Sequence, residues 1–483
     1  MSSRRIQDIY TSDDFTRGLV DDIAVSDSLA PKNSVRKAVN VRFDRPRGAV
    51  SQRYGTTAIG SVIVASNIKG LHNFRAATTA ATSRLIASVA GTLQYWNGTT
   101  WVSSHSGFEA TAKSRFITYV DRVAHLNGVD AVRTWEGIAG WVASGTNLDE
   151  GNWPITRYAA LLNGRMCAAG NTTLPSRLYQ SSIVSTAGAI SWTSGNRNVD
   201  VYPNDGNGAI TSIHSNGRVI LIFKERGFYR YDDNELQRIV GIGTPSHESV
   251  FTDDNGVTYF FGQGANSVGI YATNGGFPRK ISRPIQKWID AISASSYGDV
   301  AGFTDGSKCV WSVGNVTVDD IAYSNVCLVY VISDQTWTVE AYADSFKVFA
   351  SYINTASSLV VVGGDSDGNV QTISSGNTDN GTAINSECEF APVVLGKRGE
   401  TKTIEEIVTF ARDCQGLNLL MAADEGRFEA IGGIDKRVKQ FKAFPKLKGH
   451  LFYPKITCAN SGTPFVFEGF EINYAITEGY SML

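Results

Sequence analysis

The chain has 483 residues, of which 42% are hydrophobic and 19% charged, and its formal net charge is −2. A chain of this length can bury enough apolar surface to fold without disulfides or a structural metal. The near-zero charge argues against bulk electrostatic attraction to nucleic acid or to an anionic membrane. With 48 Gly and 12 Pro, the composition is typical of a turn-rich all-β protein.

The six cysteines lie far apart and include no CxxC pair, and the amino terminus lacks the apolar core of a signal peptide. We therefore expect reduced core cysteines in a protein assembled in a reducing cytosol. No apolar run approaches the ~18 residues of a membrane-spanning helix, so no membrane span is expected.

Residues 1–60 predict an extended amino-terminal segment that lies over another domain or a neighbouring subunit. A basic cluster occurs near its end, at Arg42, Arg45, Arg47 and Arg53. These arginines are candidate interface or channel contacts. Two interpretations stay open: contacts with DNA phosphates, and the favoured one, ion pairs with the preceding aspartates or at a subunit interface.

Residues 61–382 repeat one pattern, which is clearest at RVILIFKERGFYRYD, residues 218–232. The apolar run is too short for a buried helix, a charged turn interrupts it, and Asn216-Gly217 just upstream favours another tight turn, so the pattern predicts a β-meander. Comparable units recur after steps of 37, 42, 54 and 38 residues, counted from the markers Ile86, Val123, Arg165, Val219 and Val257. This spacing predicts a β-propeller of six or seven blades. Residues 278–292 are an exception, because their apolar spacing predicts a short helix on the propeller rim.

Residues 383–483 contain six longer strand patterns without helices, which predicts an antiparallel β-sandwich or barrel. The only basic run of this region comprises Lys436, Arg437, Lys439, Lys442, Lys446 and Lys448. The run could face DNA phosphates, but a solvated strand face or an acidic protein partner is the favoured interpretation. These residues are also candidate interface or channel contacts.

Chemical motifs are weak throughout the sequence. GDSDG at 364–368 matches the G-x-S-x-G nucleophile elbow, but a strand pattern follows where the elbow requires a helix, so a hairpin turn is expected. The same residues lack the spacing of an EF-hand, no His/Cys cluster suits zinc, and no phosphate-binding loop appears. We therefore expect no catalytic residue, cofactor or metal, and no enzymatic activity.

One motif bears on the fold. TDDNGVTY at 252–259 resembles the Asp-box of sialidases through Thr252, Asp254, Gly256 and Tyr259. In that family the box is a structural hairpin turn that recurs in several blades, and catalysis lies elsewhere. The match therefore supports a propeller more than it supports an enzyme.

The order of parts resembles the tail hub, or nozzle, proteins of short-tailed (podovirus-type) bacteriophages. The resemblance rests on NVRFDRPRGAVSQRYGT, VILIFKERGFYRYD, NGGFPRKISRPIQKWI after GVTYFFG, and GHLFYPKITC followed by FVFEGFEINYA. It implies a structural virion protein that forms a homo-oligomeric ring, usually of six subunits, around the DNA-ejection channel. It further implies attachment to a portal or adaptor and to fibres or spikes, transient passage of double-stranded DNA, and assembly in the cytoplasm of a bacterial host. The amino-terminal segment and the carboxy-terminal sandwich would then form the ring, with the propeller projecting outward.

Two alternatives remain. A glycan-binding or sialidase-like propeller would stack aromatic side chains such as Trp96, Trp135 and Trp337 on sugars, whereas the simpler interpretation places these tryptophans in blade cores. A receptor-binding tail-fibre protein would differ from a hub only in its position on the particle.

Overall fold

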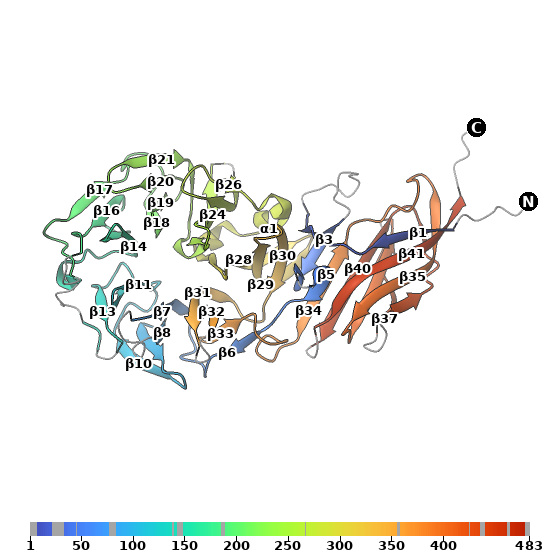
Figure 1. Ribbon diagram of the computed structural model, residues 1–483, viewed down its shortest axis with the longest axis horizontal. Helices are drawn as coiled ribbons and strands as arrows, with labels where there is room; N and C mark the ends of the chain where they lie inside the picture. The colour runs from blue at the N-terminus through green and yellow to red at the C-terminus, as the bar shows by residue number, and fades with distance from the viewer. Residues whose placement is uncertain are drawn as a thin grey trace, which may run out of the picture.

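The computed structural model describes most of the chain. The described residues are 7–21, 33–44, 46–76, 84–137, 140–142, 148–184, 189–265, 267–354, 358–424, 426–434, 440–460 and 464–478. Over these ranges the protein is nearly all-β, with a propeller joined to a second, sandwich-like module (Figure 1). None of the helices in these ranges has the length and apolar character needed to cross a membrane.

The first four blades follow the chain in order, each an antiparallel sheet of three or four strands. Blade 1 comprises β7 (Ile68–Phe74), β8 (Arg84–Val89), β9 (Thr92–Trp96) and β10 (Trp101–Ser106). Blade 2 comprises β11 (Arg115–Tyr119), β12 (Arg122–Leu126) and β13 (Arg133–Trp135). Blade 3 comprises β14 (Tyr158–Leu162), β15 (Arg165–Ala169), β16 (Arg177–Gln180) and β17 (Arg197–Asp200). Blade 4 comprises β18 (Ile210–Ser215), β19 (Ile220–Lys224), β20 (Phe228–Tyr231) and β21 (Leu236–Val240).

The remaining blades close the ring. Blade 5 comprises β22 (Ile242–Gly243), β23 (Phe251–Thr252), β24 (Thr258–Gly264), β25 (Val268–Thr273) and β26 (Arg279–Lys280). The next position is taken by β27 (Ala301–Thr304), β28 (Lys308–Val318), β29 (Ile321–Val331) and β30 (Thr336–Ala341), which belong to a larger sheet. The closing blade comprises β31 (Phe346–Ile353), β32 (Leu359–Asp365), β33 (Val370–Ile373) and β6 (Thr56–Ala58). Among the described residues, six separate blades and the β27–β30 unit therefore surround one axis, which confirms the predicted propeller.

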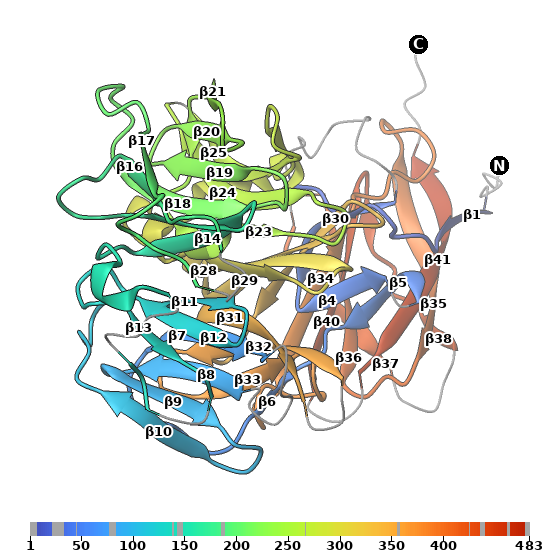
Figure 2. The same cartoon turned by 60° about the vertical axis from the view of Figure 1, so that its left-hand side comes forward.

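The amino-terminal part of the chain supplies the outer strand of the closing blade. β6 pairs antiparallel with β33, with Thr57 opposite Thr372 (Figure 2). The innermost strand of this blade, β31, in turn packs beside β7 of blade 1. A strand from before the propeller thus completes its last blade, so the two ends of the ring are held by backbone hydrogen bonds.

The short helix lies in the segment predicted for it. A 3-10 turn at Arg283–Ile285 leads into α1 (Gln286–Asp290), and Ile285, Trp288 and Ile289 are buried. α1 packs against β25 and β28. The apolar residues whose spacing predicts the helix therefore lie on a single buried helical face.

The second module is a sandwich of two sheets. One sheet has seven strands, β1 (Gln7–Ser12), β4 (Val41–Asp44), β5 (Arg47–Gln52), β35 (Thr401–Arg412), β38 (Gln440–Ala443), β39 (Lys448–Gly449) and β41 (Val466–Glu478). The other sheet continues from β30 in the order β3 (Ser34–Val39), β34 (Ile384–Phe390), β40 (Phe452–Asn460), β36 (Leu417–Ala423) and β37 (Glu429–Ile434). β2 (Gly18–Leu19) pairs with β3 beside this path. Phe390 lies between the sheets, with ring centroids 4.7 Å from Phe15 and 5.4 Å from Phe470.

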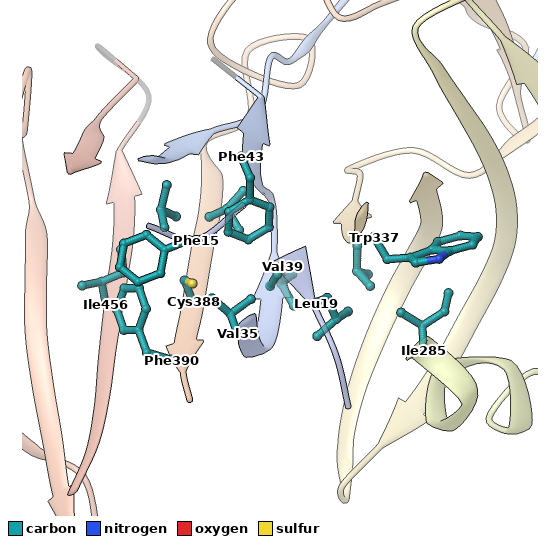
Figure 3. Close-up of a cluster of buried hydrophobic side chains, with 14 of the residues drawn as sticks. Phe15, Leu19, Val35, Val39, Phe43, Ile285, Trp337, Cys388, Phe390 and Ile456 are labelled. Atoms are coloured by element: carbon teal, nitrogen blue, oxygen red, sulfur yellow. The ribbon is translucent and has the colours of Figure 1, made fainter. Parts of the chain in front are cut away.

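The propeller and the sandwich share a sheet and a core. The ten-stranded sheet runs from β27 in the propeller to β37 in the sandwich, and Val39 pairs with Val339 where they meet. Buried side chains continue across this junction, from Ile285 and Trp337 through Leu19 to Phe390 (Figure 3). The continuity of backbone hydrogen bonding and apolar packing makes the two modules one block.

Candidate functional site

The predicted arginine cluster divides into one buried and two more accessible side chains. Arg53 is 1% exposed. Its guanidinium donates to both carboxylate oxygens of Asp379, at 2.8 and 2.7 Å, to Asn40 Oδ1 at 2.7 Å, and to the carbonyls of Tyr54 and Ala341. All five donors are used within the chain. Arg53 is therefore a structural residue at the junction, and the prediction that it contacts a partner or a channel is corrected.

Arg42 and Arg47 line a groove of about 520 Å³ where β4 and β5 meet the edge of the propeller. Arg47 is 72% exposed and pairs with Asp334 at 3.1 Å. The guanidinium of Arg42 lies 4.1 Å from the centroid of the Tyr54 ring. Lys308, at the start of β28, lines the same groove. The sequence did not single out Lys308, which lies 266 positions after Arg42. Arg45, the fourth member of the cluster, lies outside the described residues.

The carboxy-terminal basic run lies on the seven-stranded sheet as far as it is described. Lys442 pairs with Glu406 at 2.9 Å and Lys446 with Glu405 at 2.6 Å, and both lysines are exposed. Lys448 is exposed in β39. An exposed, ion-paired face suits both a solvated strand face and an acidic protein partner, so both interpretations stay predictions. Lys436, Arg437 and Lys439 lie outside the described residues.

Both motif-like turns are hairpins. In GDSDG, Asp365 Oδ1 accepts hydrogen bonds from the backbone N–H of Asp367 and of Asn369, each at 2.8 Å. In the Asp-box segment, Asp253 Oδ1 accepts in the same way from the N–H of Asn255 and Val257. The two carboxylates therefore stabilise turns by satisfying backbone donors. No helix follows Ser366, so the nucleophile elbow is absent from this turn.

A polar cluster that the sequence did not reveal crosses the propeller axis. Arg115 at the start of β11 in blade 2 donates to Glu248 at 2.6 Å, although Glu248 lies in the 3-10 turn His247–Ser249 near blade 5. Lys113 lies 3.5 Å from the same carboxylate and donates to the Gly298 carbonyl at 2.7 Å. Burial alone would raise the pKa of Glu248, but Arg115 and Lys113 hold it well below its usual value. Beside this bridge is a cavity of about 830 Å³ lined by polar and apolar side chains of several blades.

Two histidines join blades 4 and 5 near the axis. His214 lies 2.7 Å from the Thr252 hydroxyl, and Nδ1 of His247 lies 2.8 Å from the Ser212 hydroxyl. Burial lowers the pKa of His214 to about 4 and that of His247 to about 3. Both imidazoles are therefore neutral at pH 7 and act as hydrogen-bonding links between blades.

The tryptophans proposed to stack on sugars differ in accessibility. Trp135 and Trp337 are each 1% exposed, and Nε1 of Trp337 donates to the Ile281 carbonyl. Trp96 is half-buried and packs against Trp101, with ring centroids 5.5 Å apart. Trp135 and Trp337 thus occupy cores. The six cysteines are buried and unpaired, and the described residues include no group of three or more His, Cys, Asp or Glu side chains suited to a metal ion.

Comparisons with known proteins assign no family and no function to the chain. No family model matches the chain, and no curated protein matches it. Similar solved structures include "YCF48 bound to D1 peptide" (TM-score 0.40, 10% identity, 66% of this chain and 94% of that chain), the N-terminal domain of Nup159 (0.40, 8%, 66% and 95%) and the AfRom2 CNH domain (0.39, 11%, 66% and 99%). At such low identity, nothing about function follows from these similarities.

Proposed function

We propose that the protein is a structural subunit of a bacteriophage tail, a hub or nozzle protein that forms a six-membered ring around the DNA-ejection channel. In this proposal the ring contacts a portal or adaptor protein and carries fibres or spikes, and the subunit is assembled in the bacterial cytoplasm. The proposal extends the sequence resemblance given above to the whole assembly. It assigns no enzymatic activity to the chain.

One structural observation supports the proposal. The propeller and the sandwich are fused through a ten-stranded sheet, a shared apolar core and the buried Arg53–Asp379 pair. A ring subunit that transmits load between a portal and fibres must hold its two modules in a fixed relation, and a shared sheet resists rotation between them far better than a flexible linker does.

The proposal is tested by looking for closed rings of the purified protein and for the protein in virions. Mass photometry and negative-stain microscopy of the purified full chain should show closed rings, and immunogold labelling should place the protein at the tail of virions. Persistent monomers together with absence from particles would refute the proposal. Labelling at fibre tips would instead support the receptor-binding alternative. Turnover of a fluorogenic sialoside would support the sialidase-like alternative.

A further inference from the structure

The groove between β4, β5 and the propeller edge contains more charge than its internal contacts use. Its walls hold four cationic and four anionic side chains: Arg42, Arg47, Arg53, Lys308, Asp44, Asp305, Asp334 and Glu340. Its volume, about 520 Å³, is within the roughly 300–1,000 Å³ of small-molecule sites. A ligand can pair only with those charges that are not already paired within the chain.

Three of the four carboxylates are already engaged. Asp334 pairs with Arg47 at 3.1 Å, and Glu340 accepts a hydrogen bond from the Tyr342 hydroxyl. Asp305 Oδ1 accepts from the backbone N–H of the two following turn residues, 307 and 308, each at 2.9 Å. Arg53 is likewise committed to Asp379. Of the acids, only Asp44 is left without a partner within the described residues.

Two of the cations are not neutralised. Nε of Arg42 is buried without a hydrogen-bond partner among the described residues, which is rare for a charged donor. Its guanidinium is held against the Tyr54 ring, so its orientation is set before any ligand arrives. The ammonium group of Lys308 donates to the Ser374 hydroxyl at 2.9 Å and has no carboxylate partner within the described ranges.

We propose that this groove, which we call the Arg42–Lys308 groove, binds the phosphate group of a small phosphorylated molecule. Arg42 would supply a planar fork of donors and Lys308 a point charge, which is the combination that proteins use for phosphate. Asp305 and Glu340 keep their negative charge, because the donors that they accept from are uncharged, and the four cations and four anions of the groove cancel in sum. The proposal therefore rests on the two cations without a carboxylate partner, and Asp44 can accept a hydrogen bond from a hydroxyl of the same ligand. The assignment is independent of the tail-ring proposal.

A DNA duplex fits the groove less well than a small phosphate ester does. Asp44, Asp305 and Glu340 line the groove without an ion pair among the described residues, so their carboxylates would repel the successive phosphates of an extended backbone. A single phosphate group can bind to Arg42 and Lys308 without facing all three. The observations therefore favour a small phosphorylated ligand.

The test uses the full chain, with isothermal titration and phosphorus NMR at low ionic strength. The probes are inorganic phosphate, adenosine 5′-monophosphate, a short DNA duplex and an acidic peptide. We expect saturable binding of both phosphate probes and a loss of about tenfold or more in R42Q and in K308Q, the size expected for one charge-assisted hydrogen bond. R47Q is the matched control, because Arg47 lines the same groove but is already paired with Asp334.

Several outcomes would overturn the assignment. The assignment is wrong if the wild type shows no saturable binding of phosphate, or if R47Q loses as much phosphate affinity as R42Q does. It is also wrong if the chain binds the duplex or the acidic peptide but neither phosphate probe. Tighter binding of the monophosphate than of inorganic phosphate would support a phosphate ester, and equal affinity would support free phosphate. If R42Q does not fold, the titrations of K308Q and of the wild type still test the assignment.

Discussion

Removing the buried guanidinium of Arg53 should destabilise the junction between the propeller and the sandwich. Arg53 follows β5 of the sandwich and precedes β6 of the closing blade, whereas Asp379 lies between β33 and β34. Their contact therefore joins the two chain segments that connect the modules. In Arg53→Met the side-chain volume is largely kept, but five hydrogen bonds and the ion pair are lost.

The expected loss in the free energy of unfolding follows from the burial of both side chains. The side chains of Arg53 and Asp379 are 1% and 5% exposed, so water cannot replace the lost partner of the carboxylate. Breaking a buried pair by removing one partner costs about 3–5 kcal/mol, because the remaining charge stays desolvated. The backbone N–H of Ala343 still donates to Asp379, at 3.1 Å, which places the expected loss in the free energy of unfolding toward the lower end, about 3 kcal/mol.

Calorimetry and urea denaturation followed by tryptophan fluorescence would measure this loss. Arg47→Met is the matched control, since Arg47 is 72% exposed and its surface ion pair should contribute less than about 1 kcal/mol. The double variant Arg53→Met with Asp379→Asn should be less destabilised than the sum of the single variants, because the unpaired charge is gone. A loss below about 1 kcal/mol in Arg53→Met, or strict additivity in the double variant, would refute the reasoning.

Three further results are expected. The unfolded chain binds protons to its histidines below about pH 6.5, whereas burial keeps His214 and His247 neutral in the native state to lower pH. The free energy of unfolding should therefore fall as the pH drops from about 6.5 to 4, and each of the two histidines should contribute up to about 1.4 kcal/mol per pH unit to this fall. In His214→Gln, the thermal midpoint should depend less steeply on pH. Asp365→Ala should lose about 1–3 kcal/mol through unsatisfied turn donors, whereas Ser366→Ala should be neutral by the same denaturation assay. The six buried cysteines should react with a thiol reagent in denaturant but much more slowly in the native protein.

Turn chemistry explains why the propeller could be predicted from sequence. Asn97, Asn127 and Asn216 each accept hydrogen bonds from the backbone N–H groups two and three residues later, and each precedes a glycine with positive φ. Such turns depend only on neighbouring residues, so the Asn-Gly pairs mark the hairpins directly. The strand patterns between such turns recur after steps of 37, 42, 54 and 38 residues, and this spacing predicts the propeller.

The role of Arg53 could not be predicted, because its partner is 326 positions away. The composition of residues 42–53 indicates a basic cluster, but no feature of the neighbouring sequence distinguishes a buried arginine from an exposed one. The bridge from Arg115 to Glu248 across the propeller axis could not be predicted for the same reason. Long-range pairs of charges have no sequence period, whereas strands and turns do.

The amino-terminal strands make the propeller and the sandwich interdependent. β1, β4 and β5 belong to the seven-stranded sheet, β2 and β3 to the ten-stranded sheet, and β6 to the closing blade. A fragment that starts at residue 61 would therefore leave the closing blade without its outer strand, and residues 383–483 alone would expose unpaired edges in both sheets. Unpaired edges expose backbone donors and acceptors that pair with other chains. The same pairing that excludes independent modules also fixes their relative position, because each amino-terminal strand would have to leave a sheet before the propeller could rotate against the sandwich.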